Sequence, residues 1–301
     1  MKKINILLFA SSLGLFGCSA GVPYPSSKLT VATWNLEHLA SDGNLGCKVR
    51  TESDYKLLSQ YVNTVDADVF ALQEVASEAA VARIFNPQQW QIIMSSRADS
   101  PSYTCRGNGN LSTQQKVAFA VKKSIQVTNL KHLTSFSKVK LGAREGLQLS
   151  LDYNNQTINL LNLHLKSGCF PQDYSQSDSA SCQVFAKQVD ILKQYVASQL
   201  GNDDKWLMLG DFNHHVADKN NKFRNVLFDA MAAPTNNTLT VLTDEKVSCH
   251  PKYPAPIDHI ISSSAMTNAL STPPVMFHKY AQPPRTMLSD HCALSATFNI
   301  H

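Results

Sequence analysis

A short apolar run that stops at a row of polar side chains most constrains how this chain can fold. Residues 207–209 read Leu-Met-Leu, Gly210 follows, and residues 211–215 read Asp-Phe-Asn-His-His. The apolar run predicts a buried strand, and the glycine predicts the point at which that strand ends. Polar groups just past the end of a buried strand lie where α/β sheets bind their ligands. The next question is therefore which other strands end in the same way.

The rest of the sequence alternates between segments of strand type and segments of helix type, which predicts an α/β fold. Apolar residues at helical spacing predict a helix from Ser53 to Val65, a short helix from Ser77 to Phe85, and a long helix that ends near Leu200. The polar stretch 97–115 is long enough to be a functional loop. Apolar or β-rich runs predict strands at 29–34, 68–73, 90–95, 116–121, 126–130, 147–153, 158–163, 239–242, 257–262, 275–280 and 293–300.

Five of the predicted strand edges carry groups that can bind a metal or transfer a proton. Each has a simpler explanation when taken alone: Glu74 could favour a helix start, Asp211 could form a turn, and His164 could be a hydrogen-bonded core histidine. Together they favour one common site, because a buried charge is costly unless it is paired or metal-bound. The five edges carry Asn35 with Glu37, Glu74, His164, Asp211 with Asn213, and Asp258 with the later pair Asp290 and His291.

The chemistry of these groups indicates hydrolysis of a phosphate ester. Carboxylate and amide oxygens without cysteine favour Mg²⁺, with Mn²⁺ or Ca²⁺ as alternatives, over zinc. Two histidines with carboxylate partners suit an anionic transition state that needs hydrogen-bond donors. This reaction needs three kinds of group together: a metal ion, a carboxylate that orients the attacking water, and imidazolium groups that donate hydrogen bonds.

The same residues carry a resemblance to a known family. In order, the motifs are TWNLE at 33–37, LQEV at 72–75, LHLKS at 163–167, GDFN at 210–213, IDH at 257–259 and LSDHC at 288–292. They resemble the motifs of the endonuclease/exonuclease/phosphatase superfamily, whose fold is that of deoxyribonuclease I, over about residues 29 to 300. The resemblance implies a four-layer α/β sandwich, in which two packed mixed β-sheets flanked by helices place these loops at one edge.

The resemblance also implies how the site works. Asp211 would orient or deprotonate the attacking water, and Asn213 would fix its position. His164 and His291 would donate to the phosphoryl oxygens, and Asp258 would polarise one of them.

Other residues would hold the metal and the substrate. Glu74 would bind the divalent metal with the help of Asn35 and Glu37, and Asp290 would support a second metal or a histidine. Arg144 matches the position of a phosphate-binding arginine in deoxyribonuclease-like members. Lys166 could contact a second phosphate. For both cations, a solvated surface charge is the simpler alternative.

His164 separates the chain from the abasic-site endonucleases, which lack a histidine there. The run 164–169, His-Leu-Lys-Ser-Gly-Cys, is most similar to exported bacterial nuclease-like members. We expect a metal-dependent phosphodiester hydrolase, an exported endonuclease that cleaves DNA or RNA. A phosphatase or phosphodiesterase for a small or lipid phosphate ester is the alternative enzyme, and a catalytically silent binding module is the alternative outside enzymes.

The N-terminus predicts export. Lys2 and Lys3 precede a mostly apolar run to Phe16, which is too short to span a bilayer comfortably and has the layout of a signal peptide over 1–17. The run 15–18, Leu-Phe-Gly-Cys, resembles a bacterial lipobox, which would make Cys18 the lipidated first residue of a tether over 18–28; ordinary cleavage near Ala20 is the alternative. We expect a membrane-anchored lipoprotein that faces the periplasm or the exterior, or a secreted protein.

Residues 29–301 are expected to form a single domain that acts as a monomer without a protein partner. The formal net charge is only +4, of which Lys2 and Lys3 contribute two, so a polyanion would have to be bound locally or through a metal. The six cysteines after Cys18 predict disulfides in an exported chain. Cys169 and Cys182 bound one short polar loop and are the favoured pair; Cys47 with Cys105 would leave Cys249 with Cys292.

Overall fold

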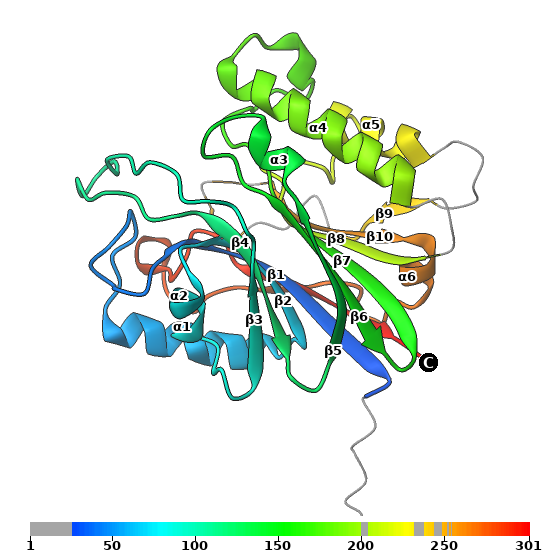
Figure 1. Ribbon diagram of the computed structural model, residues 1–301, viewed down its shortest axis with the longest axis horizontal. Coiled ribbons are helices and arrows are strands. Elements are labelled where there is room, and N and C mark those ends of the chain that lie inside the picture. Colours follow the sequence, from blue (N-terminus) through cyan, green and yellow to red (C-terminus); the bar gives the residue numbers. More distant parts are fainter. Residues whose placement is uncertain (1–25, 200–203, 232–237, 244–248, 252, 254) are drawn as a thin grey trace, which may run out of the picture.

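The computed structural model describes residues 26–199, 204–231, 238–243, 249–251, 253 and 255–301. Two six-stranded mixed β-sheets pack face to face, and helices cover both outer faces (Figure 1). The four-layer sandwich implied by the resemblance is therefore confirmed. The predicted signal peptide, Cys18 and most of the predicted tether lie outside the described residues.

The first sheet has the strand order β11-β12-β1-β2-β4-β3. Strands β1 and β2 are parallel, and the other neighbours are antiparallel. Its strands are β1 (Lys28–Leu39), β2 (Val69–Val75), β3 (Trp90–Met94), β4 (Lys116–Lys122), β11 (Met276–His278) and β12 (Ala293–Asn299).

The second sheet has the order β5-β6-β7-β8-β10-β9. Here β7 and β8 are the parallel pair. Its strands are β5 (Gln126–Leu133), β6 (Gly146–Tyr153), β7 (Gln156–His164), β8 (Lys205–Asp211), β9 (Leu239–Val241) and β10 (Asp258–Ser263).

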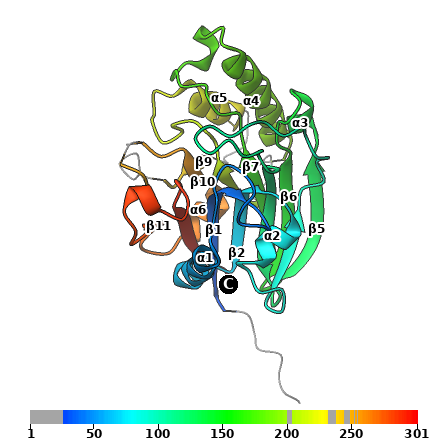
Figure 2. The same ribbon diagram turned by 90° about the vertical axis from the view of Figure 1, so that its left-hand side faces the viewer.

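Helices lie on the outer faces, and Figure 2 shows α4 and α5 at the opposite end of the molecule from α1. The α-helices are α1 (Glu52–Val65), α2 (Glu78–Ala82), α3 (Ser135–Lys138), α4 (Ala180–Gln199), α5 (Lys222–Met231) and α6 (Ser264–Asn268), and the 3₁₀ helices are η1 (Tyr174–Gln176) and η2 (Pro284–Thr286). Among the described residues, no helix combines the length and the apolar character needed to cross a membrane.

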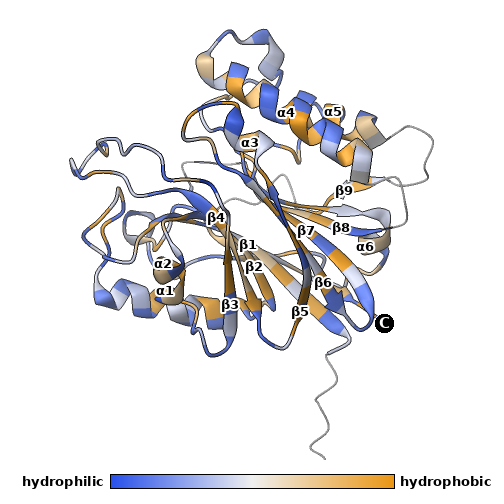
Figure 3. Cartoon of the chain, in the orientation of Figure 1, coloured by the Kyte–Doolittle hydropathy of each residue, from blue (hydrophilic) through white to orange (hydrophobic). Residues whose placement is uncertain are grey.

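Successive side chains of a strand point to opposite faces of the sheet, so apolar residues on both faces form three apolar cores. On β8, Leu207 and Leu209 pack between the two sheets, whereas Met208 packs against α4 and α5. On β1, Val31 faces the other sheet and Trp34 faces α1. Figure 3 shows the same pattern as apolar strands inside and polar loops and helix faces outside.

A buried polar contact joins the two sheets directly below the ends of β2 and β7. The side-chain amide of Gln73 donates to Asn162 Oδ1 at 2.8 Å, and Asn162 Nδ2 donates to the carbonyls of Leu72 and Ala118 at 3.0 and 2.8 Å. Both side chains are fully buried. Satisfied buried amides fix a unique arrangement, so this contact sets the relative position of the two sheets at this edge.

The predicted start of the first helix is wrong by two residues. Thr51, not Ser53, is the N-cap, because Thr51 and Asp54 form a capping box: Thr51 Oγ1 accepts from the Asp54 backbone N–H, and Asp54 accepts from the Thr51 backbone N–H. The short helix does begin after Ser77 as predicted, but it ends at Ala82.

Candidate active site

The predicted site residues gather where strands of both sheets end. His164 ends β7, Asp211 ends β8, and Asp258 begins β10. The strand register places His164 and Asp258 opposite Asp211 on its two neighbouring strands. Asn35 reaches Asp211 from β1 of the other sheet, since its side-chain amide donates to Asp211 Oδ2 at 3.0 Å. These four side chains therefore lie together across the edge of both sheets.

Left-handed backbone conformations turn the ends of β1 and β2 into the site. Glu37, His38 and Glu74 have φ angles of 43°, 59° and 59°, and the register between the two strands shifts between Asn35 and Leu39. Such conformations are costly for residues other than glycine and cluster at functional sites, and an irregular strand changes the direction of its side chains. Here the His38 backbone N–H donates to Glu74 Oε2 at 3.2 Å.

Gly210 allows β7 and β8 to approach closely below the site. Its φ is +146°, and a Cβ atom there would lie 2.0 Å from the Leu163 carbonyl oxygen, so only glycine fits. The backbone N–H of Asn213 then donates to Asp211 Oδ1 at 2.8 Å. Because Asn35 holds Oδ2, both oxygens of the Asp211 carboxylate are fixed.

The acidity of Asp211 is shifted toward neutral pH. Burial raises the pKa of Asp211 to about 7; the His291 charge works against this rise, and the Asp258 charge adds to it. Asp211 Oδ2 lies 3.5 Å from His164 Nε2 and 4.0 Å from His291 Nε2. A carboxylate that releases its proton near neutral pH suits a general base.

His291 and Asp258 form a close ion pair, with 2.7 Å between His291 Nδ1 and Asp258 Oδ2. Burial alone would lower the pKa of His291, but the Asp258 carboxylate, with Asp211 and Asp290, raises it well above its usual value. His291 is therefore protonated at neutral pH and also carries a proton on Nε2. A protonated imidazole at this position can donate to an anionic oxygen.

Glu74 lies between two histidines. Its Oε1 is 3.7 Å from His164 Nε2, and its Oε2 is 3.6 Å from His38 Nε2. Burial would raise the pKa of Glu74, but His164, His38 and Arg144 lower it to about 2. Burial and the Arg144 charge also keep the pKa of His164 well below its usual value. At neutral pH, Glu74 is ionised and His164 is neutral.

Glu37 connects the end of β1 to the loop that carries His291. Its Oε2 accepts from the backbone N–H of Asp290 at 2.9 Å and lies 3.0 Å from the Lys48 ammonium group. Burial and the Asp290 charge raise the pKa of Glu37, and Lys48 opposes them. Glu37 and Asp290 thus lie side by side at the rim of the site.

These residues fit a divalent cation. Carboxylate oxygens of Asp211 and Asp258 lie within 4.8 Å of each other and of a His291 ring nitrogen. Because the protonated His291 has no free lone pair, the two carboxylates are the groups that could bind the cation beside it, and Asp258 Oδ1 is buried without a hydrogen-bond partner. Hard oxygen donors such as these favour Mg²⁺, Mn²⁺ or Ca²⁺. The residues that the sequence assigned to the metal lie beside this cluster: Asn35, Glu37, Glu74 and Asp290.

Three groups around Glu74 had no assigned role in the sequence analysis. His38 Nε2 lies 3.2 Å from the Gln115 side-chain amide and 3.4 Å from the Tyr103 hydroxyl. Gln115 Oε1 accepts from the Arg144 guanidinium at 3.0 Å. The only signals in the sequence were the place of His38 just after the first motif and the polarity of the 97–115 loop.

Four cations gather at the side of the site where β7 ends. The pKa of Lys166 is lowered by partial burial and by the charges of Arg144 and Lys140, and the pKa of Arg97 is lowered by burial and by Arg144. Arg97 and Arg144 donate to the side-chain carbonyls of glutamines, and Lys166 donates to the Ser167 carbonyl. Both cations predicted to bind phosphate, Arg144 and Lys166, belong to this cationic edge.

Two histidines, one just after the GDFN motif and one in the IDH motif, have structural contacts. The His214 ring stacks on Phe185 with 4.7 Å between centroids, and its Nδ1 lies 2.8 Å from the Asn221 side-chain amide. His259 is fully buried, with its Nε2 2.9 Å from the His214 carbonyl oxygen. Burial lowers the pKa of both imidazoles to about 4. His214 and the next residue, His215, also line a pocket beside the site.

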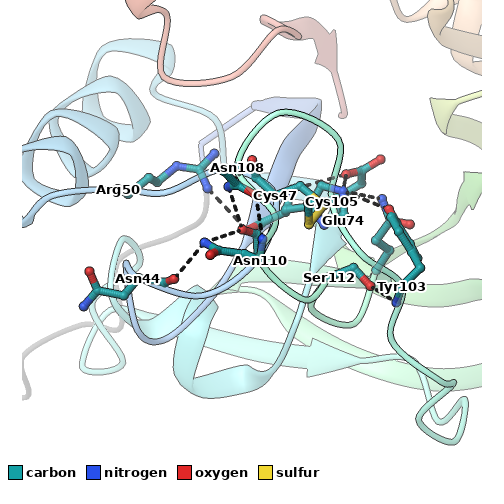
Figure 4. Close-up of a disulfide and its surroundings, with 12 residues drawn as sticks. Asn44, Cys47, Arg50, Glu74, Tyr103, Cys105, Asn108, Asn110 and Ser112 are labelled. Atoms are coloured by element: carbon teal, nitrogen blue, oxygen red, sulfur yellow. Dashed lines mark hydrogen bonds and ion pairs between the residues drawn. A yellow bond between two sulfur atoms is a disulfide. The ribbon is translucent and has the colours of Figure 1, made fainter.

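Three disulfides are present, and they are the pairs weighed from the sequence: Cys47–Cys105, Cys169–Cys182 and Cys249–Cys292. Figure 4 shows the first one joining the loops that follow β1 and β3, with Glu74 close by. The Asn108 side-chain amide donates across this junction to the Cys47 carbonyl at 3.3 Å, and that of Asn110 donates to the Asn44 carbonyl at 3.2 Å. Cys182 lies within α4.

Comparison with known proteins agrees with this geometry. The sequence profile of the Endonuclease/Exonuclease/phosphatase family matches residues 32–291. The chain belongs to this family. Its members are metal-dependent phosphoric ester hydrolases, so the predicted family and the predicted class of enzyme are confirmed. No curated protein sequence matches the chain.

Solved structures share the fold of this family member. A humanised D. rerio TDP2 is 19% identical with a TM-score of 0.59, and the match covers 91% of this chain and 100% of that one. The catalytic domain of human Nocturnin with bound sulfate is 15% identical with a TM-score of 0.59, over 92% and 96% of the two chains. The 3′ phosphatase NExo from Neisseria, bound to a product DNA hairpin, is 16% identical with a TM-score of 0.60, over 90% and 99%.

Proposed function

We propose that this family member hydrolyses phosphodiester bonds in nucleic acid, as an endonuclease that uses Mg²⁺. The observation that carries the choice of substrate is the cationic edge of Arg97, Lys140, Arg144 and Lys166. Burial is the main cause of the lowered pKa values of Arg97 and Lys166, and the Arg144 charge adds to it, so these cations lie close enough to interact beside the catalytic groups. Repelling cations at one edge suit a substrate that carries several phosphates in a row.

Each catalytic group has a separate role in the hydrolysis. Asp211, fixed by Asn35 and by the Asn213 backbone, accepts a proton from the attacking water. His291, protonated and held by Asp258, donates to a phosphoryl oxygen as negative charge develops. A divalent cation held by the neighbouring carboxylates would supply further stabilisation of that charge.

His164 and Arg144 act on the other side of the phosphate. His164 is neutral and lies 3.5 Å from Asp211, so a proton on its Nε2 can serve either Asp211 or a phosphoryl oxygen. The planar Arg144 guanidinium, oriented by Gln115, suits two parallel hydrogen bonds to a phosphate.

The test is a comparison of substrates. Purified protein is incubated with plasmid DNA, RNA, sphingomyelin and bis-p-nitrophenyl phosphate, with Mg²⁺ or EDTA, alongside Asp211→Asn as the inactive control. We expect Mg²⁺-dependent cleavage of nucleic acid by the unmodified protein alone. Intact DNA and RNA beside a cleaved phospholipid or aryl ester would contradict the proposal.

We also propose that the protein is exported and anchored by a lipid on Cys18. The three disulfides support an oxidising compartment. Metabolic labelling with palmitate in a bacterial host, with Cys18→Ala as the control, tests the anchor. Label that persists in the variant, or is absent from both, would contradict it.

A further inference from the structure

A pocket of 530 Å³ lies beside the Asp258–His291 pair, and both residues line it. Two disulfides support its walls: Cys169 is tied to α4, and Cys249 is tied to Cys292, the neighbour of His291. The volume is within the range of pockets that hold small organic groups. The pocket is therefore a built feature that is continuous with the catalytic site.

Flat rings dominate the described lining of this pocket. Phe170 contributes a ring that is 83% exposed, and His215, Tyr253 and Phe277 add further rings. The aliphatic contribution from the described lining is small and includes Ile257. Rings with polar edges suit a planar heterocycle that stacks and hydrogen-bonds, whereas an acyl chain would need an aliphatic wall.

The pocket adjoins the cationic edge, since Lys166 donates to the Ser167 carbonyl and Ser167 lines the pocket. In the strand order β7-β8-β10, His164 is on one side of Asp211 and Asp258 is on the other. The described lining of the pocket extends from the segment that follows β7 to Asp258 on β10, and it contains no lysine or arginine. The lining also includes Asp258, Asp290 and His291, so the rings adjoin the catalytic groups directly.

We infer that this pocket holds the base of the nucleotide on one side of the scissile phosphate, stacked on Phe170, while the rest of the strand follows the cationic edge. The inference rests on the proposed nuclease function and adds a base-binding subsite to it. Because a base must leave its stack to enter a pocket, single-stranded or frayed nucleic acid is the expected form of the substrate.

The first test compares two single-stranded oligonucleotides that differ only by one abasic residue next to the cleaved bond. The unmodified protein should have a KM about tenfold higher for the abasic one, since base–ring stacking is lost, with a similar kcat. Phe170→Ala should remove this difference, and Leu130→Ala on the distant edge strand β5 should retain it. Equal KM values for the two oligonucleotides with the unmodified protein would overturn the inference.

The second test measures binding without turnover. 2-Aminopurine replaces one base at a time in an oligonucleotide mixed with Asp211→Asn, and its fluorescence should change at one position flanking the scissile phosphate as that base leaves its neighbours. The change should disappear in the Asp211→Asn, Phe170→Ala double variant. Binding without a change at any position would overturn the pocket assignment and leave the nuclease proposal standing, whereas no binding by Asp211→Asn together with no cleavage by the unmodified protein would overturn both.

Discussion

Asp258 Oδ2 lies 2.7 Å from His291 Nδ1, and this contact keeps the imidazole protonated at the centre of the site. Asp258→Asn should therefore lower kcat by about 10²- to 10³-fold, which is the usual cost of losing one donor to an anionic transition state. Since the carboxylate raises the pKa of His291, its loss should also shift the alkaline fall in activity to lower pH. A pH profile of kcat/KM measures both effects. Asp229→Asn on α5 is the matched control, and an unchanged alkaline limb in Asp258→Asn would contradict the assignment.

Asp211 should set the acid limb of the same profile. Its pKa is raised to about 7, so kcat/KM should rise with pH through that region as the carboxylate loses its proton. Asp211→Asn should abolish turnover at every pH. Activity that is already maximal at pH 5 would show that another group is the base.

The raised pKa of Asp211 also affects stability, in the direction opposite to activity: activity should rise with pH, whereas the contribution of Asp211 to stability should fall. A carboxyl group whose pKa is raised on folding stabilises the fold at low pH, and this contribution is lost as pH rises through about 7. Asp211→Asn should thus match or exceed the Tm of the unmodified protein at pH 8, while losing that advantage at pH 4. A variant that is much less stable at pH 8 would argue against a strained buried carboxylate.

The catalytic edge was predictable because each strand ends where an apolar run in the sequence meets a polar residue. Apolar runs stop at Glu74, His164 and Asp211, and the burial of those runs made the polar residues conspicuous. The surroundings of Glu74 were not predictable in the same way. His38 and Gln115 meet 77 positions apart, through a loop whose path depends on long-range contacts, and neither interrupts an apolar pattern. The pocket around Phe170 likewise joins segments from five separate parts of the chain.

Helix boundaries show a similar limit. Ser53 and Thr51 are both good capping residues, and the choice depends on whether a partner lies three positions later. Asp54 follows Thr51 at that spacing and decides the start of α1. The helix α5 was not predicted; it begins after Asn221, whose buried side chain accepts from the backbone N–H groups of Phe223 and Arg224.

Arg144 should contribute to affinity through charge. Removing one phosphate contact should weaken binding of an oligonucleotide and reduce the slope of log K against log salt concentration by about one. Fluorescence anisotropy in the inactive Asp211→Asn background measures this effect for Arg144→Ala. Lys56→Ala, which removes an exposed charge from α1, is the control. An unchanged slope would place Arg144 outside the binding surface.

The disulfides should differ in their effect on stability. Cys47–Cys105 closes 58 residues and Cys169–Cys182 closes 13, so chain entropy predicts losses of about 4 and about 3 kcal/mol in the free energy of unfolding when each is removed. Urea denaturation of the two double Cys→Ser variants tests the order. A larger loss for the shorter loop would mean that local packing, rather than loop closure, determines the effect.

Gly210 should be the glycine whose replacement is most damaging to the site. In Gly210→Ala, the new Cβ would meet the Leu163 carbonyl oxygen at 2.0 Å, so β7 and β8 would have to separate next to His164 and Asp211. Gly107 also has a positive φ, +103°, but a Cβ there meets nothing within 4 Å. Gly107→Ala therefore isolates the backbone cost of about 1 kcal/mol, and Gly210→Ala should lose about 3 kcal/mol or more of unfolding free energy. It should also lose turnover in whatever fraction remains folded, because the separation moves His164 away from the Asp211 carboxylate. Equal destabilisation in the two variants would show that the close approach of the strands is not what requires glycine at this edge.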